Sequence, residues 1–241
     1  MNQGISVIIP AVDEALSIGK AVDQFLQHAN RNLIEVIVVD GGSKDATKEI
    51  AAGAGATVEV CSKRNRAAQM NVGAAKAAYD ILYFVHADVI VPASFMHDIS
   101  TAMFNGFQCG CYRSAFDKYP GLMKLNSFMT RFNLLTFRGG DQTLFITKSA
   151  FQKLHGFDEY YSIMEDYDII SRIWQTKIPF QLIQKDVIIS TRKYNNNSWL
   201  RVQIANGVAM SLFKLGKSPE DIKKYYRKLL RYKHENYLPS S

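Results

Sequence analysis

Short apolar runs alternate with helical patterns along the first half of the chain. The first run, Ser6 to Pro10, is followed by apolar residues at helical spacing from Ile18 to Leu26. Further runs follow at Glu35–Asp40, Thr57–Val60 and Ile81–Val85, separated by helical patterns that begin at Ser43 and at Arg66. Strands that are apolar throughout are typical of a parallel sheet covered by helices on both faces. The pattern therefore predicts an α/β fold with a mostly parallel sheet.

The second half of the chain continues to mix strand and helix patterns, but less regularly. Predicted strands lie at Phe107–Phe116, Thr143–Thr147, Phe180–Ile183 and Val187–Thr191. Predicted helices lie at Pro120–Phe137, just after Thr147, in the second part of Gly156–Trp174, and in a tail that begins after Asn195–Ser198. The α/β prediction therefore extends through the strand at Val187–Thr191, and helices follow it.

Polar side chains follow the apolar runs of the first half. They are Asp13 and Glu14, Asp40, the cluster Lys63 to Arg66, and His86 with Asp88. In open α/β sheets, ligands bind outside the carboxyl ends of the strands, so we expect these side chains to line one edge. Asp13 has a second explanation, because Asp commonly caps the helix that follows it.

The composition of the chain limits both the class of protein to which it can belong and the kind of partner that it can bind. The chain has 241 residues, 47% hydrophobic and 21% charged, with a net charge of +7, which favours anionic partners. Three cysteines are an odd number and predict no disulfide framework. The N-terminus lacks a secretory pattern and no run reaches the roughly 18 apolar residues of a membrane span. We therefore expect a cytoplasmic protein, either soluble or bound at the inner membrane face.

The common phosphate-binding loops are missing from the sequence. There is no Walker loop ending in Lys and Ser or Thr, and no G-x-G-x-x-G after the first strand. A carboxylate at a strand end offers another route, because it holds a divalent cation that in turn bridges diphosphate oxygens. We expect Asp88 to hold such a cation.

Six segments occur in the order and at the spacing of the family 2 glycosyltransferases. They are SVIIPAVDEA, VIVVDGGSKDAT, RNRAAQMNVGAA, YFVHADV, GGDQTLF and GFDEYYSIMEDYDIISRI. The chain resembles this family over nearly its whole length, and its tail resembles a bacterial subgroup, the selenodomain-associated transferases. The resemblance implies the nucleotide-sugar fold called GT-A, with a C-terminal helical extension.

The resemblance also implies roles for individual residues in binding the donor. Asp40 matches the acid that hydrogen-bonds the nucleobase, and Pro10, Asp13 and Glu14 match the loop beside the base and ribose. Arg66 matches a basic residue near the diphosphate. Asp141 and Gln142 match a segment near the sugar and acceptor, and complete the nucleotide-sugar-binding set.

The cation and the catalytic base are assigned by the same resemblance. His86-Ala87-Asp88 matches the D-x-D position, where the last Asp ligates Mg²⁺ or Mn²⁺. His86 replaces an Asp, and because imidazole favours softer cations, the identity of the metal stays open. A packed histidine bonded to the backbone is the other explanation of His86. Asp166 matches the base of inverting members, although acids also favour the first turn of a helix, the role expected for Glu165 and Asp168.

These assignments predict an inverting glycosyltransferase that uses a nucleoside-diphosphate sugar, a divalent cation and a carboxylate base. We expect a nucleotide-sugar-binding half at 1–117, an acceptor and catalytic half of the same domain at 118–196, and amphipathic helices at 197–241. The apolar stripe of Pro120–Phe137 would favour a lipid-linked acceptor if it borders the cleft. A nucleotidyltransferase and a noncatalytic nucleotide-binding module remain as alternatives, whereas nucleic acid is not an expected partner.

The tail predicts two amphipathic helices. Leu200, Ile204, Val208 and Leu212 form an apolar stripe, and after Ser218 a second helix has an apolar face with basic residues opposite. The basic residues of this second helix are Lys223, Lys224, Arg227, Lys228, Arg231 and Lys233. Two arrangements fit this pattern: the stripe packs on the catalytic domain, or the helices lie on an anionic membrane.

Overall fold

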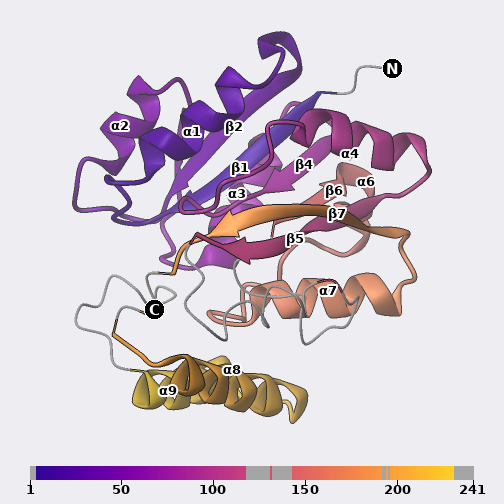
Figure 1. Cartoon of the computed structure of the whole chain (residues 1–241). Helices are drawn as coiled ribbons and strands as arrows, with labels where there is room; N and C mark the ends of the chain where they lie inside the picture. Colours follow the sequence, from indigo (N-terminus) through magenta and orange to yellow (C-terminus); the bar gives the residue numbers. More distant parts are fainter. Residues whose placement is uncertain (1–3, 118–130, 132–142, 192–193, 195, 231–241) are drawn as a thin grey trace.

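The computed structural model describes residues 4–117, 131, 143–191, 194 and 196–230. Its centre is a seven-stranded sheet in the order β3-β2-β1-β4-β6-β5-β7 (Figure 1). The strands are β1 Ile5–Ala11, β2 Ile34–Asp40, β3 Thr57–Val60, β4 Ile81–Phe84, β5 Cys109–Phe116, β6 Leu144–Thr147 and β7 Phe180–Ile189. The helices are α1 Ile18–Gln27, η1 (3-10) Arg31–Leu33, α2 Thr47–Gly53, α3 Arg66–Lys76, α4 Phe95–Phe104, α6 Lys148–Lys153, α7 Glu165–Gln175, α8 Trp199–Lys214 and α9 Pro219–Leu229.

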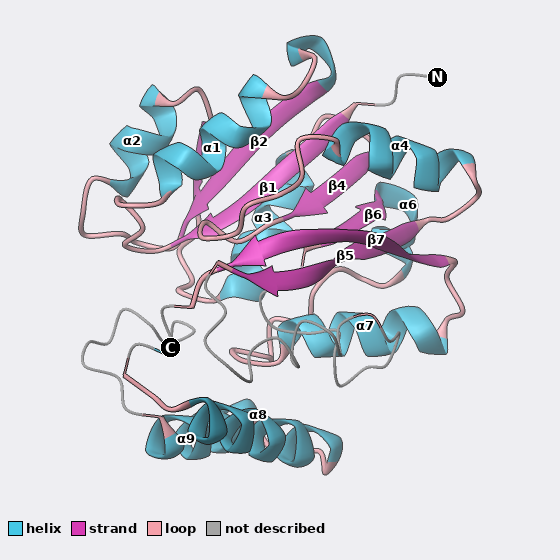
Figure 2. Cartoon of the chain, viewed as in Figure 1, coloured by secondary structure: helices cyan, strands magenta, loops and turns pink. Residues whose placement is uncertain are grey.

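Helices cover both faces of this sheet (Figure 2). On one face, side chains of β1, β2 and β4 pack against α1, α2 and α4 around Phe25 and Phe95, which are fully buried. On the other face, alternate residues of the same strands pack against α3, α6 and α7. Burial on both faces is the reason that these strands are apolar throughout. The predicted α/β fold is therefore confirmed.

The four strands β3, β2, β1 and β4 run parallel, so their carboxyl ends lie at one edge. The register places Ala11, the last residue of β1, opposite Asp40, the last residue of β2. β6 runs antiparallel between β4 and β5, and β7 pairs with β5 in parallel. Strands from the two predicted halves, 1–117 and 118–196, thus share one sheet, while the boundaries themselves stay a prediction.

One strand replaces the two that the sequence predicts near Phe180–Ile183 and Val187–Thr191. β7 is continuous, and Gln184 and Lys185 form a bulge where the register with β5 shifts. Lys185 Nζ binds Asp98 Oδ1 at 2.6 Å, so this residue of the bulge has a partner outside the sheet. The break in the apolar pattern is therefore a bulge, which interrupts pairing for a few residues without ending the strand.

Helix α2 begins at Thr47, four residues later than the sequence predicts. Ser43 lies in the preceding loop, where its backbone N–H donates to the Asp40 carboxylate. Asp45 accepts a hydrogen bond from the N–H of Thr47 at 3.1 Å, which satisfies a donor of the first helical turn. The polar loop between β2 and α2 is thus longer than predicted.

The tail forms an antiparallel pair of helices, α8 and α9, seen at the bottom of Figure 1. The buried face of α8 consists of Val202, Ala205, Ala209 and Met210, whereas Leu200 and Ile204 are 60% and 50% exposed. Of the two predicted arrangements, packing of the stripe on the catalytic domain is not found at Leu200 and Ile204; α9 packs instead on the face with small residues. Among the described helices, none is long and apolar enough to cross a membrane.

Candidate active site

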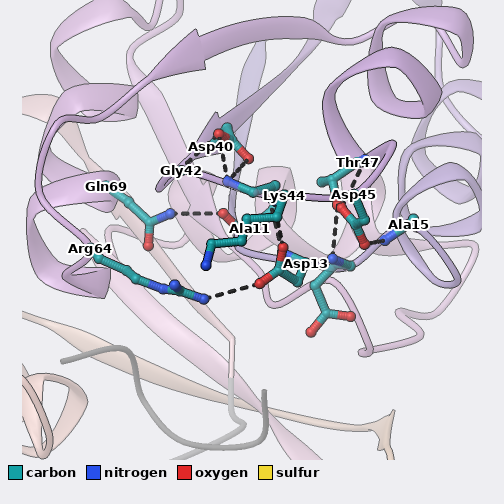
Figure 3. Close-up of polar contacts among 12 residues, drawn as sticks. Ala11, Asp13, Ala15, Asp40, Gly42, Lys44, Asp45, Thr47, Arg64 and Gln69 are labelled. Atoms are coloured by element: carbon teal, nitrogen blue, oxygen red, sulfur yellow. Dashed lines mark hydrogen bonds and ion pairs between the residues drawn. The ribbon is translucent and has the colours of Figure 1, made fainter. Parts of the chain in front are cut away.

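Asp40 closes β2 and is almost fully buried at the carboxyl edge of the sheet. Its carboxylate accepts hydrogen bonds from the backbone N–H groups of Gly42, at 2.9 Å, and Ser43 (Figure 3). These bonds satisfy a charge that burial would otherwise penalise. Asp40 therefore shapes the turn after β2.

Asp13 has a left-handed backbone with φ of 53° and links three segments of the site. One carboxylate oxygen accepts the N–H of Lys44 at 2.7 Å, and the other pairs with Arg64 Nη2 at 3.0 Å (Figure 3). Helix α1 starts after Ser17, so the explanation of Asp13 as a helix cap is wrong. Asp13 instead joins the β1 loop to the loops after β2 and β3.

The rest of the β1 end is held in the same way. The N–H of Glu14 donates to Thr47 Oγ1 at 2.8 Å, and Pro10 is buried within β1 opposite Val39. From α3, the buried amide of Gln69 donates to the carbonyl oxygens of Ala11 and Val39. Gln69 was missed by the sequence reasoning, and its only signal was a polar residue on an otherwise apolar helix face.

A cluster of four charged or titratable side chains lies beyond this loop. Arg66 Nε is 3.2 Å from Glu165 Oε1, and Arg66 Nη1 is 3.5 Å from His86 Nε2. The same His86 nitrogen is 3.9 Å from Asp166 Oδ2. The first turn of α3, the end of β4 and the start of α7 thus converge at the carboxyl edge of the sheet.

The two neighbouring acids of this cluster differ in exposure. The Glu165 side chain is 3% exposed, whereas that of Asp166 is 18% exposed. Burial raises the pKa of Glu165, the guanidinium of Arg66 lowers it, and the nearby Asp166 raises it further. Glu165, expected only as a first-turn acid, is in fact tied across the site to Arg66, which leaves Asp166 as the more accessible carboxylate.

The loop from Gly156 to Met164 that leads into α7 is anchored to α3. The Asn71 amide donates to the Phe157 carbonyl oxygen and accepts from the Phe157 N–H, both at 2.9 Å. Arg172 joins the Asp168 carboxylate at 2.6 Å and the Gly156 carbonyl oxygen at 2.9 Å, which confirms polar partners for Asp168. These bonds position Glu165 and Asp166.

The predicted metal ligands lie on a turn that follows β4. The strand ends at Phe84, and the N–H of Val89 donates to the His86 carbonyl oxygen at 3.2 Å. His86 and Asp88 are half-buried, while Ala87 between them is buried. The described residues contain no group of three or more His, Cys, Asp or Glu that would hold a metal alone. A carboxylate and an imidazole nevertheless fit a cation that receives further oxygens from a substrate diphosphate.

Asp141 and Gln142, predicted near the sugar and acceptor, lie outside the described residues, as does most of the predicted helix Pro120–Phe137. The remaining predicted residues meet at one edge of the sheet, in two groups that adjoin along the β3–α3 segment. Asp13 binds Arg64 in one group, and Arg66 joins His86 and Glu165 in the other.

Known proteins resemble this chain in sequence. An uncharacterised glycosyltransferase of Rickettsia prowazekii (strain Madrid E) is 27% identical over 207 residues, or 78% of this chain and 63% of that protein. A glucosyl-3-phosphoglycerate synthase of Mycolicibacterium paratuberculosis (strain ATCC BAA-968 / K-10) is 34% identical over 96 residues, or 36% of this chain and 29% of that protein. The chain thus matches less than two thirds of the length of these relatives.

Solved structures share its fold. A mannosyltransferase from Pyrobaculum calidifontis, in complex with GDP-Man and Mn²⁺, has a TM-score of 0.70 at 15% identity, over 93% of this chain and 68% of that one. Glucosyl-3-phosphoglycerate synthase from Mycobacterium tuberculosis, in complex with Mg²⁺ and UDP, has a TM-score of 0.61 at 18% identity, over 89% of this chain and 80% of that one. The predicted GT-A type of fold is confirmed.

The sequence profile described as glycosyl transferase family 2 matches residues 6–160, which is more than half of the chain. This match begins in β1 and ends in the loop that leads to Asp166. The chain belongs to glycosyl transferase family 2.

Proposed function

We propose that this protein transfers a sugar from a nucleoside-diphosphate sugar to an acceptor hydroxyl, with inversion at the anomeric carbon. The observation that carries the proposal is the convergence of Arg66, His86 and Asp166 at the carboxyl edge of the sheet. Two proteins of similar fold support it, since one was solved with GDP-Man and Mn²⁺ and the other with UDP and Mg²⁺.

In this proposal the donor lies along the edge formed by β1, β2 and β4. The base and ribose sit at the loop from Pro10 to Glu14 and near Asp40, and Arg66 faces the diphosphate. Asp88 and His86 would hold Mg²⁺ or Mn²⁺. Such a cation neutralises the charge that develops on the departing nucleoside diphosphate.

Asp166 is the proposed base that removes the proton from the acceptor hydroxyl. Its carboxylate is more exposed than that of Glu165, which is engaged by Arg66. A base has to reach the proton that it abstracts. The partial exposure of the Asp166 carboxylate would allow an acceptor hydroxyl to approach it. Direct attack by the acceptor oxygen breaks the bond from the sugar to the diphosphate and inverts the anomeric carbon without a covalent intermediate.

Donor turnover tests the proposal. UDP- and GDP-sugars are incubated with the protein and Mn²⁺ or Mg²⁺, and released nucleoside diphosphate is measured. Asp88→Ala is expected to abolish release, whereas Asp23→Ala, an exposed acid on α1, leaves it unchanged. Formation of nucleoside triphosphate and sugar 1-phosphate, only when pyrophosphate is added, would instead indicate the nucleotidyltransferase alternative. No turnover of any donor would favour the noncatalytic module.

The role of Asp166 has its own test. Asp166→Asn is expected to lower the rate of donor turnover by about 10²–10⁴-fold while donor affinity stays the same. NMR of the fresh hydrolysis product of an α-linked donor is expected to show the β-anomer first. First appearance of the α-anomer contradicts inversion, and full activity of Asp166→Asn removes this residue as the base.

We propose further that α8 binds an anionic lipid surface. Leu200, Ile204 and Leu215 are 60%, 50% and 72% exposed, and their spacing places them on one helical face. Residues 199–230 have seven basic and two acidic side chains, a charge that complements acidic lipid. A lipid surface would agree with a lipid-linked acceptor.

Vesicle co-sedimentation tests the lipid proposal. We expect the protein to bind vesicles containing phosphatidylglycerol and not vesicles of phosphatidylcholine alone. The triple variant Leu200→Ser, Ile204→Ser and Leu215→Ser should lose this binding. Leu16→Ser, which changes a 99% exposed leucine elsewhere, is the matched control. Equal sedimentation of the triple variant and the control would remove the proposal.

A further inference from the structure

Helix α9 packs against the segment that leads into the candidate active site. Ile222 of α9 is fully buried in a cluster with Ile163 and Met164, the two residues that precede Glu165. Met164 has a left-handed backbone with φ of 73° and is held in that cluster by Ala209 and Met210 of α8. The tail is therefore in contact with the site.

Lys223, the residue after Ile222, is 7% exposed and interacts electrostatically with Glu165 and Arg66. The sequence pattern places it on the solvated basic face of α9, and burial shows that this expectation is wrong for Lys223. Within the described part of the chain, its ammonium group has no hydrogen bond or close ion pair. The nearby carboxylate of Glu165 is already engaged by Arg66 at 3.2 Å.

A lysine whose side chain is largely buried and has no close carboxylate is poorly compensated, because desolvation penalises its charged form. Burial lowers the pKa of Lys223 to about 8, and Arg227 and Arg66 lower it as well, against the opposing effects of Glu165 and Glu220. An anion beside Lys223 would supply the missing charge. Arg66 and Lys223 thus both interact with the Glu165 carboxylate, which Arg66 already engages at 3.2 Å.

We propose that Lys223 binds a phosphate group of a substrate together with Arg66, so that α9 supplies part of the active site. The inference rests on the proposed transferase function and extends it to a residue from the tail. The phosphate has two sources: the diphosphate of the donor, or a phosphate on the acceptor. Both place an anion beside Arg66 at the start of α3 and beside Lys223 on α9.

Three variants separate this role from a purely structural one. Lys223→Met removes the charge and keeps the length of the side chain, and Lys223→Arg keeps the charge. Lys224→Met is the matched control, because Lys224 is the exposed neighbour on the same helix. Thermal unfolding of each variant establishes that it is folded before any ligand is added.

Calorimetry with two probes distinguishes the sources of phosphate. Inorganic pyrophosphate with Mn²⁺ stands for the donor diphosphate, and inorganic phosphate, added to protein saturated with Mn²⁺ and UDP or GDP, stands for the acceptor group. Lys223→Met is expected to weaken one probe by about tenfold or more, while Lys223→Arg and Lys224→Met bind as the native protein does. Unchanged binding of both probes by folded Lys223→Met overturns the inference.

Proton uptake provides a readout that a structural lysine would not change. An anion raises the pKa of Lys223, so binding at pH 8 should take up protons, detected from the dependence of binding heat on the buffer. This uptake should disappear in Lys223→Met and remain in Lys224→Met; equal uptake in both contradicts the inference. Failure of the transferase function is recognised separately, as the absence of nucleoside diphosphate release from every donor.

Discussion

Single residues at the carboxyl edge have both structural and chemical tasks. Asp13 and Asp40 bind backbone groups of loops, and Gln69 binds those of two strand ends, so removing any one of them alters the shape of the site. Polar residues that are buried in this way stabilise the fold only while their partners remain. Substitutions at these positions therefore have to be tested for stability before activity.

Asp13→Ala is expected to lower the free energy of unfolding by about 2–3 kcal/mol, because it removes two charged contacts and leaves alanine at a left-handed φ. Asp13→Asn should lose less, since Asn tolerates this backbone and still accepts a hydrogen bond from the Lys44 N–H. Urea denaturation measures both variants. Equal losses for Ala and Asn would contradict the explanation.

The raised pKa of Glu165 leads us to expect that the free energy of unfolding depends on pH. Its pKa in the folded protein is raised above the ordinary 4.5, so the folded state binds more protons than the unfolded state, and stability falls as pH rises through the raised pKa. Glu165→Gln removes this titration. Stability of Glu165→Gln relative to the native protein should therefore increase above about pH 4.5. Urea denaturation of both proteins measures this. If the difference between their free energies of unfolding is constant from pH 4 to pH 8, the expectation is refuted.

Whole elements position the site through close packing. Helix α3 lies so close to the sheet that a Cβ added at Gly73 would be 2.4 Å from Ile8 Cγ2 and 3.1 Å from Val39 Cγ2. The same helix begins with Arg66 and contains Gln69, so its distance from β1 and β2 determines where both side chains lie. The glycine is thus part of the geometry of the site.

Gly73→Ala is expected to destabilise the protein by about 1–3 kcal/mol, although alanine by itself favours a helix by about 1 kcal/mol over glycine. The clash of the added Cβ with Ile8 outweighs the helix preference of alanine, so the net effect is destabilising. Gly53→Ala, where an added Cβ meets no atom within 4 Å, is the control and should not destabilise. Thermal and urea unfolding compare the two variants. Stabilisation by Gly73→Ala would contradict the prediction, because it would show that the sheet shifts to make room for the methyl group.

The whole molecule brings distant segments into one site, and this assembly predicts a response to ligand. Nucleoside diphosphate with Mn²⁺ should raise the melting temperature, because a ligand that binds only the native state stabilises it, by about 2.7 kcal/mol at 100 times Kd. EDTA should abolish the increase. Asp88→Ala should show none, and an increase that survives EDTA would contradict binding through a cation.

The pattern of apolar and polar residues along the chain was sufficient to predict most of the fold. Apolar strands, their order with helices and the polar residues at strand ends were predicted, and the edge where Asp13, Asp40, Arg66 and His86 lie followed from parallel pairing. The errors arose where a pattern had two solutions. The polar break in β7 is a bulge and not a turn. In α8 the face with small residues is buried, whereas Leu200 and Ile204 of the predicted apolar stripe are exposed.

The sequence by itself determined the α/β class, the family and the edge that holds the candidate chemistry, because these depend on periodicity and on residues next to one another in the chain. Only the tertiary structure decided that Glu165 pairs with Arg66, that Gln69 bridges two strand ends, and that Lys223 is buried beside the site. Such pairings join residues far apart in the chain. Their free energies depend on burial and distance, which exist only once the elements have packed together.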